Sequence, residues 1–344
     1  YVKNPHAVQH VRAGTDTYAF EYAFKDQNEA PWIWSWSYNR TATDAAIDQF
    51  GAPPFIYEPY RPTERELERR RRVIHAGLFR QNGDYVEPDY NAMVGHYMDF
   101  AEPLHGLLEQ TAGSRRSDKL ETLLKFVQDI PYSILPDRLK DRVIAGVLPP
   151  PHMFVERWGD CDSKAVLFAS VLAHDPSMRL VFLLVPNHIL LAVEGIPRPY
   201  QHAVEVKGRT YILAEPVGPG RVDLGDTGAY RYDRFNDVIE VRPTRLRARD
   251  AAPVVGACSA CCGGRWRARR VHRALERRRQ HALHDAAGRS RNHAHGIART
   301  QRSQDSGQGH DSQSRRIPAR TAGVVRSFGR LPGDGVRETQ RSAH

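Results

Sequence analysis

Cysteine is scarce in this chain, with four residues in 344. Cys161 stands alone in the first 250 residues, and the other three lie close together after residue 257. A disulfide framework needs several paired cysteines, so none is expected for the folded part of the chain. An isolated cysteine is a candidate either for packing or for thiol chemistry.

Long apolar runs are missing as well. No stretch approaches the ~20 apolar residues that a bilayer-spanning helix needs, and no signal peptide is recognisable. We therefore expect no membrane segment. The sequence starts at Tyr1 rather than Met, which is typical of a fragment, and a cytoplasmic location is the default expectation.

Lysine is absent from residues 251–344, where 19 Arg and 6 acidic residues give a net charge of +13. The first 250 residues carry a net charge of −3, so the +10 of the whole chain comes from its end. The folded part therefore has no general attraction for nucleic acid, and we expect no specific nucleic-acid partner. Non-specific binding of nucleic acid by the Arg-rich end is an alternative that its charge allows.

The region 246–344 has no apolar periodicity, and so little apolar surface cannot offset the entropy of ordering. We therefore expect disorder there. The region contains Cys258, Cys261 and Cys262, with His293 and His295 further on, but no second Cys-x-x-Cys pair at zinc-finger spacing, so no metal site is expected. Arg with Ala, Gly, His and Gln is also what a GC-rich gene gives when translated out of frame. Sequencing the locus tests this hypothesis, and an intact frame through codon 344 would contradict it.

Aromatic residues alternate with smaller or charged ones on both sides of a polar loop near Asp26, which predicts a β-hairpin over residues 17–38. A ladder of this kind either buries one face of a small sheet or forms a stacking platform for a sugar or nucleotide. Cross-strand aromatic pairs are ordinary stabilisers of sheets, so burial is the preferred interpretation. The ladder consists of Tyr18, Phe20, Tyr22, Phe24, Trp32, Trp34, Trp36 and Tyr38.

The order of the predicted elements favours an α+β fold, with helices first and an antiparallel sheet after them. We divide the chain into an N-terminal hairpin-containing region (1–60), a helical lead-in with the core (61–245) and the basic, Arg-rich end (246–344). Helices are predicted at 43–50, at 63–77, at 89–111 with a break near Pro103, and after a cap at Ser117; strands are predicted at 180–185, 188–193, 202–206 and 210–214.

Between the helices and the sheet lies the stretch that carries chemistry. Gly159 and Asp160 are turn and cap residues, and Ala165, Val166, Ala169 and Leu172 follow at helical spacing. Cys161 then falls at or just before the first helical turn, where unpaired N–H groups and the helix dipole favour a thiolate and could hold an oxyanion. A buried structural thiol is the alternative.

A cysteine nucleophile needs a base, and the base needs an acceptor that orients it. His188 begins one predicted strand, and Glu215 ends another. The candidate catalytic residues are therefore Cys161, His188 and Glu215. Asp162 would oppose the thiolate slightly, and Lys164, one turn further on, would partly offset that effect.

These residues resemble a known family. The stretch Arg157-Trp158-Gly159-Asp160-Cys161-Asp162-Ser163-Lys164-Ala165 is similar to the R-x-G-D-C-x-x-K-A signature of transglutaminase-like cysteine proteins, and the strands at His188 and at Tyr211–Pro216 resemble its second and third motifs. The resemblance covers roughly residues 117–226. It implies a papain-like α+β core, with Cys161 as nucleophile, His188 as general base and acid, Glu215 as the residue that orients the imidazole, and no cofactor. Glu215 stands where Asp is commoner in the family, and Val217 where Thr often follows.

His202 is the alternative base, because the stretch that it begins also resembles the family's His motif. A hairpin through Lys207 and Gly208 would place residue 202 opposite residue 213, close to Glu215. His188 can reach Glu215 only if residues 194–201 return the chain and bring its strand beside residues 210–215. We prefer His188 on the apolar strand that follows it.

The expected function is a cysteine hydrolase or acyltransferase that acts on a protein or peptide amide through a thioester, which water or an amine resolves. The N–H of Cys161 would supply one oxyanion donor, and Tyr132 or Trp158 a second. Two alternatives from other classes are a non-catalytic protein-binding scaffold of the same fold and a nucleic-acid binder that acts through the Arg-rich end.

Overall fold

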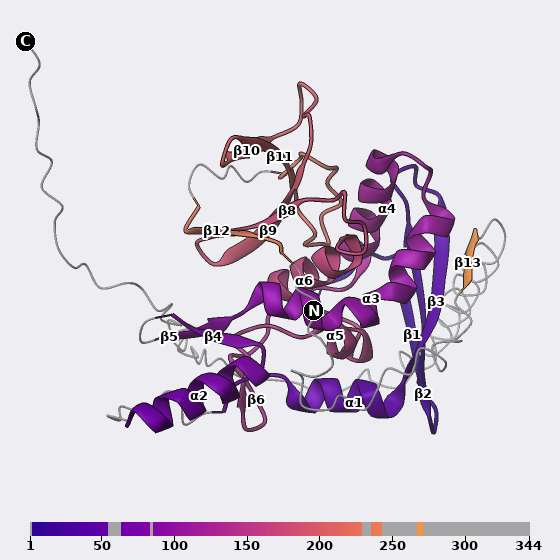
Figure 1. Cartoon of the computed structure of the whole chain (residues 1–344). Coiled ribbons are helices and arrows are strands. Elements are labelled where there is room, and N and C mark those ends of the chain that lie inside the picture. The colour runs from indigo at the N-terminus through magenta and orange to yellow at the C-terminus, as the bar shows by residue number, and fades with distance from the viewer. Residues whose placement is uncertain (1, 54–62, 83–84, 229–234, 243–266, 271–344) are drawn as a thin grey trace, which may run out of the picture. The chain divides into compact units, whose positions relative to one another are not determined.

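A computed structural model describes residues 2–53, 63–82, 85–228, 235–242 and 267–270 of the chain. It has the expected α+β composition, with antiparallel sheets and helices in one compact unit that runs from Tyr1 to Arg279 (Figure 1). The hairpin region 1–60 thus belongs to the same unit as the residues that follow it. The three cysteines after residue 257, His293, His295 and most of the region predicted to be disordered lie outside the described residues.

The N-terminal sheet has the order β1-β2-β3-β13, with β1 (Val8–Ala13), β2 (Thr17–Lys25), β3 (Pro31–Asn39) and β13 (Arg267–Arg270). The predicted hairpin is confirmed, and its aromatic residues face each other in pairs such as Phe20 with Trp36 and Tyr22 with Trp34. The four residues of β13 pair with β3, so the prediction of disorder is wrong for this short stretch.

The aromatic ladder is core. Trp34 and Trp36 are 0% and 2% exposed, and their rings pack against Phe126 and Phe154 from helices on the inner face of the sheet. Ring centroids 4.4 Å apart for Trp34 and Phe126 are typical of a tight aromatic contact. The burial of these rings therefore confirms the interpretation that the aromatic residues bury one face of the sheet.

The helices differ from prediction in three places. Asn39 accepts a hydrogen bond from Ala42 N at 2.9 Å, so the first helix begins three residues earlier than expected. Ser117 lies inside the helix that it was predicted to cap. Pro103 does not break its helix, because buried apolar side chains continue on both sides of it. The helices are α1 (Arg40–Gln49), α2 (Glu64–Ala76), α3 (Tyr90–Thr111), α4 (Arg116–Asp129), α5 (Pro150–Glu156) and α6 (Cys161–Leu172).

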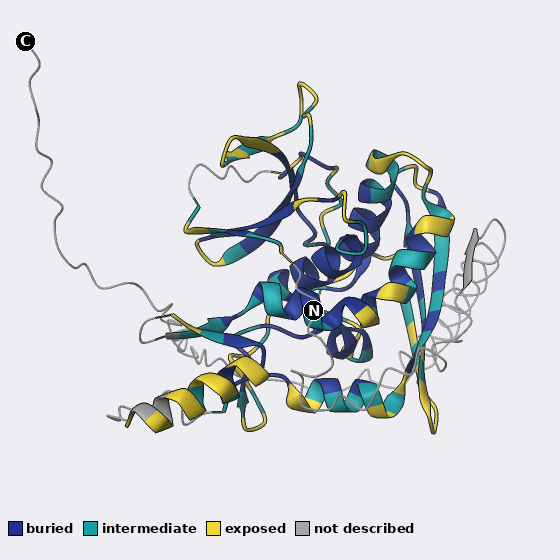
Figure 2. Cartoon of the chain, viewed as in Figure 1, coloured by how far each residue is buried: buried dark blue, intermediate teal, exposed yellow. Residues whose placement is uncertain are grey.

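The second large sheet curls beside α6 and has the order β10-β11-β9-β8-β12. Its two faces bury different side chains: Phe182 and Leu191 belong to the main core with α6, whereas Leu183 and Leu190 form a smaller cluster on the other face. Figure 2 shows α6 and the middle of this sheet in dark blue, in contrast to the exposed α2. Its strands are β8 (Leu180–Val185), β9 (His188–Glu194), β10 (Ala203–Val206), β11 (Arg209–Ala214) and β12 (Asp237–Glu240).

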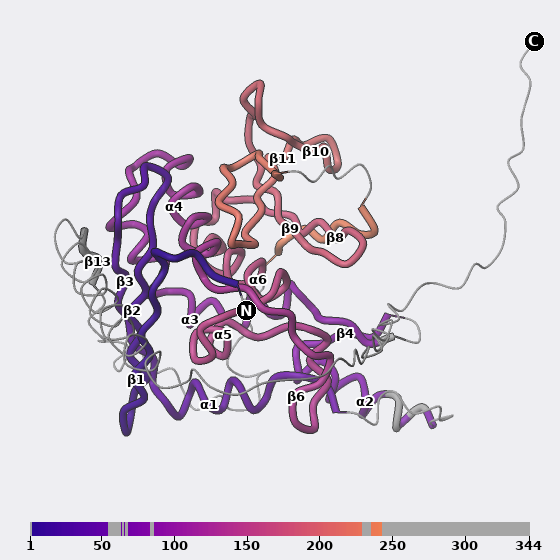
Figure 3. The backbone as a smooth tube through the Cα atoms, turned by 180° about the vertical axis from the view of Figure 1, so that it is seen from behind, coloured from indigo at the N-terminus to yellow at the C-terminus, as the bar shows by residue number. Residues whose placement is uncertain are grey.

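Short elements and an N-terminal segment complete the unit. The chain before β1 extends away from the N-terminal sheet (Figure 3), and its Val2 forms a β-bridge with Tyr132. Two small hairpins are formed by β4 (Phe79–Asn82) with β5 (Tyr85–Pro88) and by β6 (Arg138–Leu139) with β7 (Arg142–Val143). None of the described helices is both long and apolar enough to cross a membrane.

Candidate active site

Cys161 is the first residue of α6, as the sequence predicts, and it is 9% exposed. Asp160 caps the helix: its Oδ1 accepts hydrogen bonds from Ser163 N at 3.0 Å and from Ser163 Oγ at 2.6 Å. Gly159 fits closely before this cap, because a Cβ at that position would lie 2.5 Å from Met153 Sδ, and that side chain would have to move. The local sequence therefore fixes where the thiol sits relative to the start of the helix.

A second segment runs alongside this turn. Gly159 N donates to Pro131 O at 3.1 Å, and Ser133 N donates to Gly159 O at 3.3 Å. Tyr132, between these two partners, lies close enough for the charge of Cys161 to contribute to the raised pKa of its phenol, after burial as the largest cause. The phenol of Tyr132 is therefore part of the immediate surroundings of the thiol.

His188 and Glu215 form an ion pair, with 2.7 Å between Nε2 and Oε2. The sequence predicts this pair only if the strand of His188 lies beside residues 210–215. It does, because β11 lies directly beside β9 with Leu213 opposite Ala192. Glu215 is 8% exposed, and its Oε1 accepts a hydrogen bond from Val217 N at 3.1 Å. The carboxylate is thus held at both oxygens, one of them on the imidazole.

His202 lies where the hairpin geometry predicts, with its carbonyl oxygen accepting a hydrogen bond from Leu213 N at 3.0 Å. It precedes β10, which is the outer neighbour of β11, and the residue is exposed. The two candidate bases therefore sit on opposite sides of β11. Glu215 pairs with the one that precedes the apolar strand, His188.

The sulfur of Cys161 lies beside the start of β9. Burial raises the pKa of the Cys161 thiol, and the charges of Asp162 and Asp160 raise it further, whereas a hydrogen bond from the main-chain N–H of Ile189 lowers it. Ile189 directly follows His188, so this contact brings the sulfur to the strand end that carries the imidazole. His188 and Glu215 therefore meet at the ends of β9 and β11, and Cys161 begins the helix that packs against β9.

The expectation of an acidic thiol is wrong for this conformation. The thiol donates to Asp162 Oδ2 at 3.2 Å, which stabilises the protonated form. Lys164 is fully buried, its Nζ donates to Ile130 O at 2.5 Å, and burial lowers its pKa to about 7, which weakens the offset that its charge supplies. The sequence predicts only a slight opposing effect of Asp162, whereas its carboxylate accepts a hydrogen bond directly from the thiol.

Asp162 has a second partner that the sequence did not suggest. The hydroxyl of Tyr90, at the start of α3, donates to Asp162 Oδ1. Burial raises the pKa of the Asp162 carboxyl, while Tyr90, Cys161 and the charge of His188 lower it in part. Asp162 therefore links Tyr90, the thiol and the imidazole. Tyr90 lies 72 positions from Asp162 in the sequence and follows no pattern that would have found it.

The surroundings of His188 raise the pKa of its imidazole. Burial alone lowers the pKa of His188, but the hydrogen bond and the charge of Glu215, together with the charge of Asp162, raise it overall. Because Nε2 is engaged by Glu215, any proton exchange with the sulfur has to pass through Nδ1. The site thus holds a protonated thiol beside an imidazole that a carboxylate keeps oriented.

Comparison of the chain with protein-family models, with curated proteins and with solved structures finds no match. The properties of the site accordingly rest on its own geometry.

Among the described residues, one group has the ligand types of a metal site. Donor atoms of Asp160, Cys161 and Asp162 lie within 4.8 Å of one another. Their hydrogen bonds already serve other purposes, because Asp160 caps α6 and Asp162 binds the thiol and Tyr90. The group is explained by the helix start and by the site around the sulfur.

Proposed function

We propose that the protein is a transglutaminase-like cysteine hydrolase or acyltransferase that cleaves an amide of a protein or peptide. The observation that carries this proposal is the His188–Glu215 ion pair at the start of β9, the strand that packs against the helix begun by Cys161. A nucleophile at a helix start, with a base and an orienting carboxylate on the adjacent antiparallel sheet, is also the arrangement that a papain-like core would have.

The first half of the reaction forms a thioester. Cys161 Sγ loses its proton to Nδ1 of His188 and bonds to the amide carbon, which becomes tetrahedral. When the C–N bond breaks, the imidazolium returns that proton to the leaving amine, and the thioester remains on the sulfur. Glu215 holds the ring and stabilises its charge throughout, which suits the raised pKa of His188.

The oxyanion of the tetrahedral intermediate needs hydrogen-bond donors. The N–H of Cys161, at the first position of α6, is one candidate. The phenol of Tyr132 is the second, because its segment is pinned to Gly159 and its ring lies within the electrostatic reach of the sulfur. Tyr132→Phe should therefore lower kcat by about a hundredfold or more and leave alkylation of the thiol unchanged.

In the second half, water or an amine attacks the thioester carbon while His188 takes the proton of the attacking group. The thiolate leaves and is protonated again. Water gives hydrolysis, and a Lys amine gives a crosslink.

Alkylation of Cys161 by iodoacetamide, followed by mass spectrometry across pH 5–10, tests the nucleophile, with hydrolysis of a casein-type protein mixture as the activity assay. We expect alkylation that depends on His188, and peptide release or crosslinking that is abolished in Cys161→Ala. If Cys161 reacts no faster than a free thiol peptide and His188→Ala changes nothing, the proposed enzyme is contradicted.

A non-catalytic protein-binding scaffold is the second candidate, and one observation favours it. The raised pKa of the thiol, caused by burial and by Asp162, is what an inert cysteine would show. A Cys161 that is inert at neutral pH in the folded protein would support this function. Nucleic-acid binding by the Arg-rich end concerns residues almost entirely outside those that the structure describes, and truncation after residue 245 tests it.

A further inference from the structure

The loop that carries Glu215 rests on the last turn of α4. Gln128 Nε2 donates to the carbonyl oxygens of Glu215 at 2.8 Å and of Val222 at 3.0 Å. The loop approaches this turn so closely that a Cβ on Gly218 would lie 1.9 Å from Gln128 O. Lys125 Nζ adds a hydrogen bond to Val222 O at 2.7 Å. The position of Glu215 is therefore set by the end of α4 as well as by β11.

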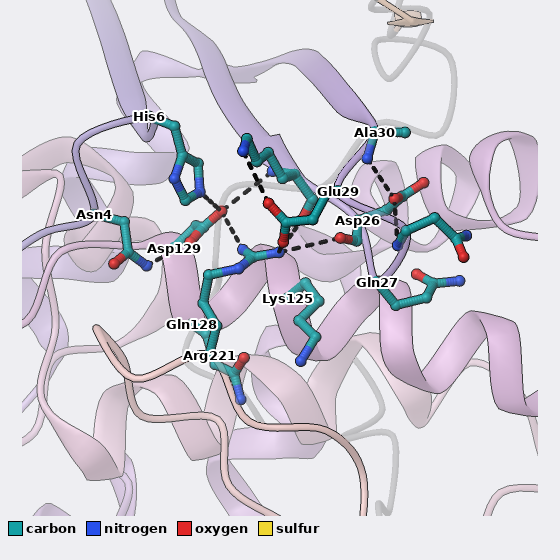
Figure 4. Close-up of polar contacts among 12 residues, drawn as sticks. Asn4, His6, Asp26, Gln27, Glu29, Ala30, Lys125, Gln128, Asp129 and Arg221 are labelled. Atoms are coloured by element: carbon teal, nitrogen blue, oxygen red, sulfur yellow. Dashed lines mark hydrogen bonds and ion pairs between the residues drawn. The ribbon is translucent and has the colours of Figure 1, made fainter.

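Asp129, the next residue after Gln128, is a buried carboxylate that joins three segments (Figure 4). Its side chain is 1% exposed. It contacts four nitrogen atoms: Asn4 Nδ2 at 2.7 Å, His6 Nε2 at 2.7 Å, Lys25 N at 3.2 Å and Arg221 Nη1 at 2.6 Å. Burial raises the pKa of Asp129, but the hydrogen bond of His6 and the charge of Arg221 outweigh burial and lower it overall. The carboxylate is thus kept charged in the interior.

Arg221 completes the connection, because it belongs to the same loop as Glu215. Besides Asp129, its guanidinium binds the carbonyl oxygens of Lys25 at 2.9 Å and of Asp26 at 3.1 Å through Nη2. A planar guanidinium that contacts several oxygens at once fixes position more strictly than a single ammonium. The loop is therefore tied to α4 and to the β2–β3 turn at the same point.

We propose that Asp129 and Arg221 are positioning residues that hold the loop 215–224 against α4 and so keep Glu215 on His188. The inference rests on the proposed function for its catalytic meaning. Neither residue touches the sulfur or the imidazole in the contacts described above; both act through the backbone of the loop. Loss of either connection would let the loop relax, and the Glu215 carboxylate would move relative to the ring.

The variant Arg221→Gln removes both the positive charge and the planar set of N–H donors of the guanidinium. We measure the titration of the His188 ring by NMR in the full chain, along with kcat and KM. The pKa of His188 is expected to fall, because Glu215 is what raises it, and kcat to fall by about tenfold or more with little change in KM. Asp129→Asn should act in the same direction, and Arg221→Lys should restore part of the lost kcat.

Arg209→Gln is the matched control. It removes an exposed Arg–Glu194 hydrogen bond of 2.8 Å on β11, away from the loop, and should leave the His188 titration unchanged. If circular dichroism shows that Arg221→Gln does not fold, Arg221→Lys takes its place. Lysine keeps a positive charge near Asp129 but lacks the planar set of N–H donors that binds several oxygens at once. An Arg221 variant that folds and titrates like Arg209→Gln would overturn the inference.

The two proposals fail separately. If the unaltered protein shows no activity, the proposed function fails, but the NMR titration still reports whether Arg221 holds Glu215 on His188. If the protein is active and the titration of His188 is the same with and without Arg221, the positioning role alone is contradicted.

Discussion

The two large sheets bury their residues for different purposes. In the N-terminal sheet, paired aromatic rings cover one face and pack on α4 and α5. In the second sheet both faces are apolar, and the polar residues gather at the strand ends, where His188 begins β9 and Glu215 follows β11. The first sheet supports the fold, whereas the second also carries His188 and Glu215 of the proposed site at its strand ends. Substitutions in the two sheets should therefore affect stability and reactivity separately.

The largest effect is expected in the N-terminal sheet. Trp34→Ala should lower the free energy of unfolding by about 3–5 kcal/mol, because it empties a fully buried site against Phe126. Urea denaturation followed by circular dichroism measures the change, and Trp34→Phe, which keeps a ring in place, should lose clearly less. If both variants lost the same free energy of unfolding, aromatic packing would not be what stabilises this sheet.

The next effect concerns the second sheet. Glu215→Gln should lower kcat/KM by about a hundredfold or more, equivalent to about 2.7 kcal/mol, because a neutral amide orients the ring but does not stabilise its charge. The pKa of His188 lies above its ordinary value, so the pair stabilises the fold below about pH 6.5 and loses that contribution as pH rises through the raised value. Unfolding at pH 5.5 and pH 9 should therefore differ more in the wild type than in Glu215→Gln.

A smaller effect, of opposite sign, is expected at Asp162. Asp162→Asn should raise alkylation of Cys161 at pH 7 by about tenfold, because it removes the acceptor that stabilises the protonated thiol. Tyr90→Phe is the companion variant. It keeps the Asp162 carboxylate but removes the Tyr90 hydroxyl that donates to it, so alkylation of Cys161 should not rise. Unchanged reactivity in Asp162→Asn would show that burial alone governs the thiol.

The smallest effect is expected at His202. His202→Ala should change kcat/KM by less than about twofold and the free energy of unfolding by less than about 0.5 kcal/mol, since the residue is exposed and Glu215 pairs with His188. The pH profile of Cys161 alkylation is the measurement, with His188→Ala as its counterpart. A loss of thiol reactivity in His202→Ala alone would make His202 the base.

Features that depend on local pattern were predictable from the sequence. The alternation of Phe20 and Tyr22 with small residues gave the hairpin, and Asp160 gave the start of α6 at Cys161. The pairing of His188 with Glu215 was predicted on the condition that the chain returned between β9 and β11, which it does.

Contacts between distant positions were not predictable in this way. Tyr90 meets Asp162 across 72 positions, and Asp129 meets Arg221 across 92. Each partner on its own has the properties of an ordinary surface residue, and only the packing of α3, α4 and α6 brings them together. The thiol's protonation was misjudged for the same reason, since charge counts along the chain do not reveal that Asp162 binds the sulfur directly.

The N-terminal segment has a practical consequence for any laboratory that prepares this protein. Val2 pairs with Tyr132 through two main-chain hydrogen bonds of 2.8 and 2.7 Å, and Tyr132 in turn bridges to Gly159, two residues before Cys161. A preparation altered at Val2 would therefore disturb the segment that runs beside the start of α6. Assays should use protein in which Val2 and the residues that follow it are unchanged.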